Sequence, residues 1–182
     1  MPETDKHGSL RSTQGHSFGV SCLGIYTKDA RDEAHFRRVE IEYNVAAAQA
    51  LVAGGGRRMA YLSGMGAKKG GWAMFARVKA DAEEALRLVP GMEKAASMRP
   101  GAILNREGGR DLGFQDTLAH VLAPVMSFFG AAVETDDIAK AMLYATMHEP
   151  AGDVADVYEN DDIKAAARVY EQEVALVAAD RE

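Results

Sequence analysis

The sequence predicts an α/β protein whose parallel sheet is covered by helices on both faces. Short apolar segments that end near glycine or serine alternate with longer segments whose apolar residues recur every three or four positions. This alternation continues through most of the chain, and strands connected by helices are typical of a parallel sheet. With 182 residues, 47% of them hydrophobic, the chain has the size and composition of one globular domain.

The first part of the chain begins with a polar leader. Residues 1–17 show no apolar periodicity and are predicted to be flexible, so the domain is placed at 18–182. The segment 18–24 is short, apolar and ended by glycine, which predicts a buried strand. A helix is predicted over 32–53, and the glycines at 54–56 end it. Its apolar stripe consists of Phe36, Val39, Tyr43, Ala47 and Ala50.

The middle of the chain predicts two more strands and a second long helix. Residues 59–63 form the second strand, residues 72–88 the helix, and residues 95–98 the third strand. A turn at 99–101 contains proline and glycine, which suit a sharp change of direction. Residues 105–113, rich in glycine, arginine and aspartate, are predicted to be a loop.

Two helices and one strand are predicted in the remaining residues, after a helix at 114–123 that ends before a proline. Thr135 is expected to cap a helix over 136–147. A final strand follows at 154–158, and Asn160 is expected to cap the last helix. The apolar stripe of that helix consists of Ile163, Ala167, Tyr170, Val174 and Val177.

Charge and motif content exclude several classes of function. A net charge of −6 provides no basic face for nucleic acid or for an anionic membrane. The sequence has no apolar run long enough to span a membrane. The single cysteine, Cys22, cannot form an intrachain disulfide and suits a reducing compartment, so a cytoplasmic location is expected. The five histidines lack the spacing of metal ligands, so no metal site is predicted.

Lys79 lies on the apolar face of the predicted helix at 72–88. It follows Phe75 by four residues and precedes Ala82 by three, so all three share one face. Two interpretations are open. The lysine buries its aliphatic stem and directs its ammonium to water, or the ammonium lies at the floor of a site, where it binds ligand hydroxyls and lowers the pKa of a neighbour.

Ser63 stands at the end of the second predicted strand, where ligands bind in open parallel sheets. The simpler interpretation is a turn serine that bonds its own backbone. Gly64 and Gly66 follow it. They either permit a tight turn or let a ligand approach the backbone closely.

Five segments together resemble the short-chain dehydrogenase/reductase superfamily. Segment 20–24 is similar to the family's fourth strand, segment 61–67 to the strand and loop that carry the catalytic serine, and segment 75–79 to the helix with a Tyr-x-x-x-Lys motif. Segment 98–103 is similar to the turn near the nicotinamide, and segment 136–142 to a late helix. The resemblance is closest to the atypical, epimerase-like branch that includes HIV Tat-interacting-protein-like and NmrA-like proteins.

The resemblance implies a partial Rossmann-like, doubly wound parallel sheet flanked by helices, with NADP or NAD as the cofactor. It implies a small-molecule carbonyl substrate that Ser63 polarises, while Lys79 holds the nicotinamide ribose. In this frame the catalytic positions are Ser63, Phe75 and Lys79. The implied cofactor-binding residues are Leu23, Gly24, Ser63, Lys79, Pro100, Gly101 and Ile103.

Two departures from the family pattern bear on activity. Phe75 stands where the family has its tyrosine, and phenylalanine has no hydroxyl to donate, so catalysis is expected to be impaired. The family also opens with three βα units, the first carrying a glycine fingerprint for the pyrophosphate. Only 17 polar residues precede Phe18, whereas a βαβ unit needs about 30 or more. Residues 18–23 would then form an unpaired apolar sheet edge, open to a homodimer or another partner.

Three interpretations of function follow. The first is an atypical NAD(P)-binding carbonyl or hydroxyl oxidoreductase with impaired catalysis. The second is a non-catalytic, NmrA-like binding or regulatory module, which Phe75 favours. The third is an incomplete product of a longer reductase gene, which would be unstable alone or would dimerise through the exposed edge.

Overall fold

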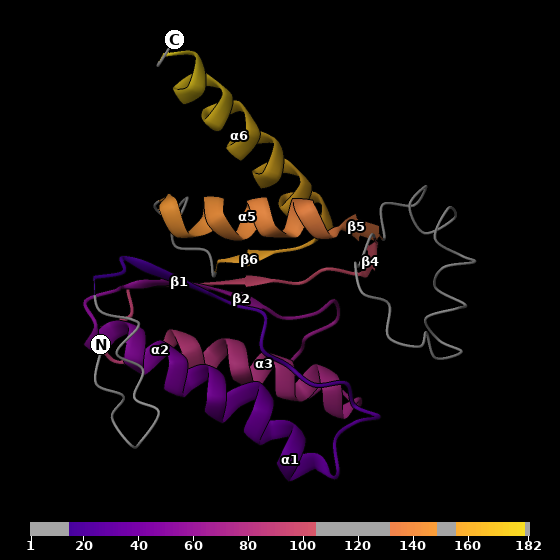
Figure 1. The fold of residues 1–182 in the computed structure, drawn as a ribbon. Helices are drawn as coiled ribbons and strands as arrows, with labels where there is room; N and C mark the ends of the chain where they lie inside the picture. The colour runs from indigo at the N-terminus through magenta and orange to yellow at the C-terminus, as the bar shows by residue number, and fades with distance from the viewer. Residues whose placement is uncertain (1–14, 105–131, 149–155, 181–182) are drawn as a thin grey trace, which may run out of the picture.

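A parallel sheet of four strands forms the centre of the molecule (Figure 1). The computed structural model describes residues 15–104, 132–148 and 156–180. The four strands, in spatial order, are β1 (Phe18–Ser21), β2 (Arg58–Leu62), β3 (Lys94–Met98) and β6 (Val157–Tyr158). Every pair is parallel, so the predicted α/β architecture is confirmed.

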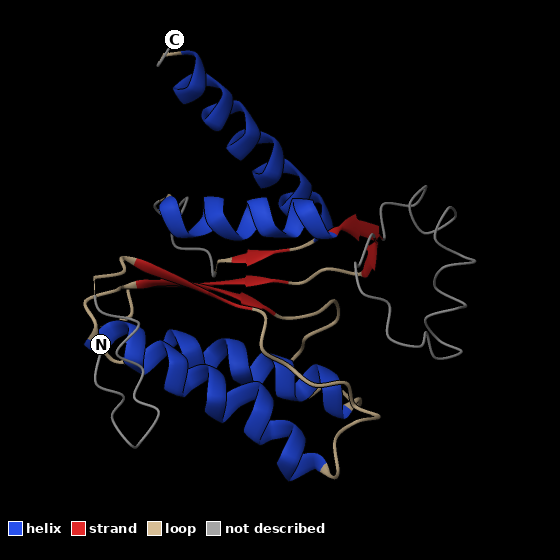
Figure 2. Ribbon diagram, in the orientation of Figure 1, coloured by secondary structure: helices blue, strands red, loops and turns tan. Residues whose placement is uncertain are grey.

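Helices cover both faces of this sheet (Figure 2). On one face, α1 (Glu33–Arg37), the π-helix η2 (Arg38–Glu42) and α2 (Tyr43–Ala53) follow one another without a break, beside α3 (Met74–Arg87). On the other face lies α5 (Thr135–Met147), and α6 (Asn160–Ala179) packs on α5. A second, smaller parallel sheet consists of β4 (Ala102–Leu104) and β5 (Ala132–Glu134).

The hydrophobic core has one part on each face of the sheet. Successive residues of β2 alternate between them, because side chains in a strand point to opposite faces. Ala60 belongs to the cluster under α5, whereas Met59 and Tyr61 belong to the cluster under α2 and α3. A strand that is buried on both faces reads as a continuous apolar segment, which is why β2 could be predicted from sequence.

The buried face of the first long helix differs from the predicted stripe. Tyr43, which the stripe placed inward, is 51% exposed. The residues that face the sheet are Phe36, Glu40, Asn44, Ala48 and Leu51. Residues spaced by four drift by about 40° at each step along an α-helix. The π-helix takes about one extra residue into its turn and cancels most of that drift.

Several other boundaries differ from the sequence prediction. Trp72 lies before α3 and is 95% exposed, so it is not part of the helix core. The N-cap of α5 is Glu134 and not Thr135. The N-cap of α6 is Glu159 and not Asn160, and Glu159 forms a reciprocal capping box with Asp162. The loop predicted at 105–113, the helix predicted at 114–123 and the first 14 residues of the leader lie outside the described residues.

Candidate functional site

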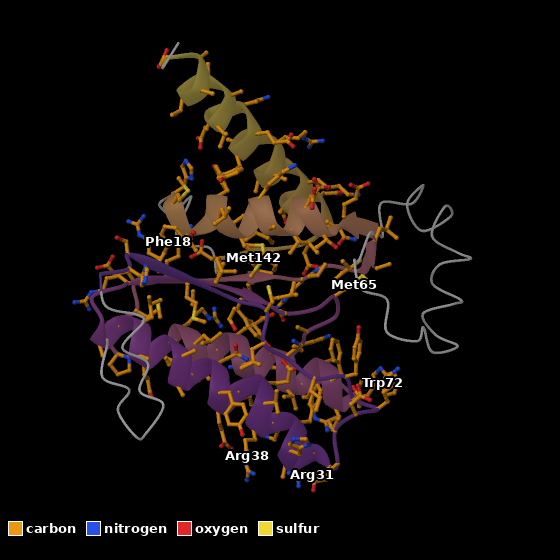
Figure 3. The ribbon with its side chains drawn as sticks, viewed as in Figure 1. Phe18, Arg31, Arg38, Met65, Trp72 and Met142 are labelled. Carbon is orange, nitrogen blue, oxygen red and sulfur yellow. The ribbon has the colours of Figure 1, made fainter. Side chains whose placement is uncertain are left out.

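The turns that follow β1, β2 and β3 meet at one edge of the sheet, called here the carboxyl edge. Figure 3 marks the direction of the strands, with Phe18 at the amino end of β1 and Met65 beyond the carboxyl end of β2. Two backbone hydrogen bonds join neighbouring turns, from Ser63 N to Met98 O (2.8 Å) and from Met65 N to Pro100 O (2.9 Å). Carboxyl ends of parallel strands are where such folds bind ligands.

Lys79 comes to this edge from α3, and its ammonium lies inside the protein. The residue is 6% exposed. Its Nζ lies 2.7 Å from Glu40 Oε2 and donates hydrogen bonds to Tyr61 Oη (3.1 Å) and to the Leu62 carbonyl (3.2 Å). An ammonium has three donors, and all three have protein partners here. The ammonium therefore does not reach into water, as one sequence interpretation held.

Glu40, on η2, is the partner that the sequence did not reveal. Its carboxylate is 1% exposed and accepts hydrogen bonds from Ile25 N (2.9 Å) and Tyr61 Oη (2.9 Å), besides pairing with Lys79. Gly24 makes the approach possible, since a Cβ there would lie 2.9 Å from Glu40 Oε1. One carboxylate thus binds the turn after β1, the strand β2 and the helix α3.

Tyr61 is buried between these two charged groups, and its hydroxyl keeps its proton. Burial, followed by the charge and hydrogen bond of Glu40, raises the pKa of Tyr61 well above its usual range. The hydroxyl donates to Glu40 and accepts from Lys79. It lies inside the core, so it is not placed to donate a proton to a ligand at the carboxyl edge.

Ser63 belongs to a second buried network. Its Oγ donates to Glu83 Oε1 (2.5 Å), which lies one helical turn after Lys79 on α3. Arg99 binds the same carboxylate with two nitrogens, from Nε to Oε1 (2.9 Å) and from Nη2 to Oε2 (2.6 Å). The hydrogen bond with Glu83 is the largest of the influences that raise the pKa of Arg99. Ser63 therefore bonds a helix carboxylate and not its own backbone.

Phe75 lies directly against the turn that follows Ser63. A Cβ on Gly64 would be 2.7 Å from Cζ of the Phe75 ring. Cζ is the ring carbon that carries the hydroxyl in tyrosine. The ring thus points at the carboxyl edge beside Ser63. Its Cζ, which carries no hydroxyl, lies against the backbone of Gly64.

Asn44 is a further polar residue that fixes the turn after β1. Its Oδ1 accepts from Ser21 Oγ (2.5 Å), and its Nδ2 donates to the carbonyls of Leu23 (3.2 Å) and Glu40 (3.0 Å). The signal that could have found Glu40 and Asn44 is their spacing, because both continue the four-residue series that begins at Phe36.

The remaining predicted cofactor residues have different surroundings. Leu23 is exposed at the carboxyl edge, and Pro100 is buried there. Gly101 N donates to Asn160 Oδ1 (2.9 Å), which joins this turn to the start of α6. Ile103 lies on β4, in the smaller sheet, and packs against the core cluster under α5. The edge thus gathers Leu23, Gly24, Ser63, Pro100 and Gly101.

Other kinds of site were sought in the part of the chain that the structure describes. Within it, no three histidine, cysteine, aspartate or glutamate side chains are grouped so that they could hold a metal ion. Nor does any helix in that part have the length and apolar character that crossing a membrane requires. Partial burial raises the pKa of the Cys22 thiol, against an opposing effect of Lys79.

Comparison with known proteins shows a likeness of structure and none of sequence. No protein-family model matches the chain, and no curated protein has a significant sequence match. Similar solved structures include RMD from Pseudomonas aeruginosa complexed with NADPH, with a TM-score of 0.56 and 19% identity over 79% of this chain. Another is the enzyme WbmG from Bordetella bronchiseptica in complex with NAD, with a TM-score of 0.54 and 13% identity over 87%.

A third similar structure is a UDP-glucose 4-epimerase from Thermotoga maritima with UDP-glucose, with a TM-score of 0.57 and 12% identity over 85% of this chain. The fold is Rossmann-like. It is shared with these three structures, which contain NADPH, NAD and UDP-glucose respectively, at sequence identities that establish the architecture and no more. The match covers 59%, 56% and 61% of the three neighbours, so this chain spans less than two thirds of their length.

Proposed function

We propose that this chain is an atypical NAD(P)-binding domain of the short-chain dehydrogenase type, with impaired oxidoreductase catalysis. One observation supports this most strongly. The turns after three adjacent parallel strands place a glycine backbone, a serine hydroxyl and a Pro-Gly turn along one edge, next to a buried lysine. Open parallel sheets bind ligands at this edge, and these are the groups that the family resemblance implies for a nicotinamide and its ribose.

Each residue would have a limited role with the cofactor. Leu23, Gly24, Pro100 and Gly101 would contact the nicotinamide side, and Lys79 would bind the ribose hydroxyls. When bound, the dinucleotide supplies hydride for a carbonyl substrate. Ser63 would polarise that carbonyl only after its hydroxyl leaves Glu83, because a serine has one proton to donate.

Catalysis is impaired in this proposal because, among the described residues beside Lys79, neither aromatic side chain is placed to donate the proton. Phe75 carries no hydroxyl, and the Tyr61 hydroxyl lies between Glu40 and Lys79 inside the core. Loss of a positioned general acid typically lowers a rate by about 10²–10⁴-fold. Water would have to supply the proton instead.

A non-catalytic binding module is the second candidate, and a specific observation favours it. Both polar groups of the expected mechanism are hydrogen-bonded to buried carboxylates, Lys79 to Glu40 and Ser63 to Glu83. A ligand would then bind at the carboxyl edge and dissociate without being chemically converted. The two candidates differ in turnover and not in binding.

A titration with NADPH and NADH tests the shared part of both candidates. We expect calorimetry to show binding by the 182-residue protein, and the Leu23→Asp variant to bind about tenfold more weakly, since a new carboxylate would repel the cofactor phosphates. The matched control is Phe18→Asp at the amino end of β1, because Leu23 and Phe18 are 44% and 38% exposed. Phe18 lies at the end of the strand away from the carboxyl edge, so this variant should bind as the parent does.

Turnover then separates the two candidates. Oxidation of NADPH in the presence of small carbonyl compounds would support the impaired oxidoreductase, whereas binding without oxidation would support the module. If the folded protein binds neither dinucleotide at millimolar concentration, the proposed function is wrong.

A further inference from the structure

We propose that Glu40 is a positioning residue that sequesters the Lys79 ammonium, so that this lysine binds a ligand only when the ion pair opens. The identity of the ligand as a dinucleotide ribose rests on the proposed function above. The sequestration itself rests on contacts within the chain. Glu40 Oε2 lies 2.7 Å from Lys79 Nζ, and both side chains are buried.

Stability alone does not explain this pair. A buried ion pair contributes little net stability compared with apolar side chains of similar volume, because both charges lose their hydration. Here the pair lies directly beneath the carboxyl edge, where Lys79 also bonds the carbonyl that precedes Ser63. A charge pair in that place suits control of a ligand site better than it suits core packing.

The surrounding chain is shaped around the Glu40 carboxylate. Gly24 leaves room for Oε1, since a Cβ there would approach it to 2.9 Å, and Ile25 N donates to the same oxygen. Glu40 also lies on the π-helix η2, and such segments are frequent at functional sites. Two local features of different elements thus place one carboxylate, which argues against an accidental contact.

Glu40 also couples the lysine to the turn after β1. The same carboxylate holds Ile25 N and Lys79, so a ligand that displaces the Gly24–Ile25 turn weakens the hold on the ammonium. The affinity of a ligand that needs Lys79 is lowered by the fraction of molecules in which the pair is open. Removing the negative charge of Glu40 should therefore expose the amine and tighten ribose binding together.

Limited acetylation of lysines, read by mass spectrometry, tests the sequestration without any ligand. In the parent protein, Lys79 should be among the least reactive lysines. In Glu40→Gln, its labelling rate should rise by about tenfold or more. The matched control is Glu42→Gln, the same change two residues away on η2, where the side chain is 67% exposed and pairs with Arg38. This control should leave Lys79 protected.

Lys94 reports on unfolding in the same experiment. Its side chain is 2% exposed, bonds the His148 carbonyl and belongs to another part of the sheet. Labelling that rises at Lys79 while Lys94 stays protected shows local release. If Lys94 also becomes reactive, Glu40→Gln has opened the fold, and Gly24→Ala replaces it, because its methyl group displaces the carboxylate without removing a charge.

Titration of the same variants with NADPH completes the test. Tighter binding by Glu40→Gln than by the parent, with Glu42→Gln unchanged, supports a positioning role. The inference is overturned if Lys79 stays protected in folded Glu40→Gln and Gly24→Ala, or if Lys79 is released and NADPH affinity does not change. If Lys79 is released and no variant binds NADPH, the sequestration stands and the proposed nicotinamide function fails.

Discussion

Tyr61 shares one hydroxyl between Glu40 and Lys79, so its loss affects both charges. In Tyr61→Phe each buried ion loses one hydrogen bond, and we expect the free energy of unfolding to fall by about 1–3 kcal/mol. Urea denaturation at neutral pH measures this. Tyr43→Phe is the control, because Tyr43 lies at the start of α2, close to Glu40 in the chain, and its side chain is exposed. An unchanged midpoint for Tyr61→Phe would mean that the hydroxyl contributes nothing to the network.

The same variant changes the dependence of stability on pH. Burial and Glu40 raise the folded pKa of Tyr61, and burial with Asp156 raises the pKa of Tyr158 to about 12. The unfolded chain releases these protons near pH 10, at about the usual tyrosine pKa. Their contribution to stability is thus full below about pH 10 and is lost as pH rises through the folded values. Tyr61→Phe should lose stability less steeply above pH 10 than the parent, and equal slopes would contradict this.

For single residues, the sequence predicted where Ser63 and Lys79 lie in the fold better than it predicted which residues they bond. The structure places Ser63 at the carboxyl end of β2 and Lys79 on the inward face of α3, as their spacing indicated. The partners Glu40, Glu83 and Arg99 were missed. Glu40 and Glu83 lie on helices, where charged residues usually face water, and Arg99 lies in the turn after β3. The spacing from Phe36 marks the position of Glu40, whereas the pairing of the two carboxylates with Lys79 and Arg99 shows only in contacts between elements distant in sequence.

The connection between β2 and α3 is an element whose geometry depends on one contact. Gly64→Ala would place a methyl carbon 2.7 Å from Cζ of Phe75, and overpacking of this kind costs about 1–3 kcal/mol. Phe75→Leu removes the ring tip, so the double variant Gly64→Ala/Phe75→Leu should be more stable than the sum of the single changes predicts. Thermal unfolding of all four proteins gives the coupling, and additive effects would show that the two residues do not meet.

Elements were predictable where burial leaves a continuous pattern. The strands β2 and β3 are short apolar segments, and their observed bounds lie within one residue of the predicted ones. The segment 18–24 was predicted to be a buried strand, but β1 ends at Ser21 and its apolar residues Phe18 and Val20 are exposed, because it lies at the edge of the described sheet. The first long helix was also predicted, but its buried face was not, since a π-helix breaks the period on which the stripe was based. The strands β4 and β5 are three residues long each and pair across a wide sequence separation, so no local pattern marks them.

The sheet as a whole ends at β1, which has no strand beside it on the outer side among the described residues. Phe18 and Val20 are exposed there, and an apolar edge strand is a template for pairing with another chain. We expect concentration-dependent self-association in analytical ultracentrifugation, and its loss in Val20→Lys. Val174→Lys on α6 is the control, because Val174 is 50% exposed and distant in sequence. Association that survives Val20→Lys would place the interface elsewhere.

The π-helix η2 differs from a regular α-helix by about one extra residue in its turn, and one codon encodes one residue. An α-helix turns by about 100° per residue, so deleting Ile41 would turn Phe36 and Glu40 relative to α2. Glu40 would then leave the core, while Asn44 on α2 would stay in register with the strands. One in-frame deletion is therefore expected to leave the lysine without its carboxylate, and to move the buried Phe36 out of the core with it.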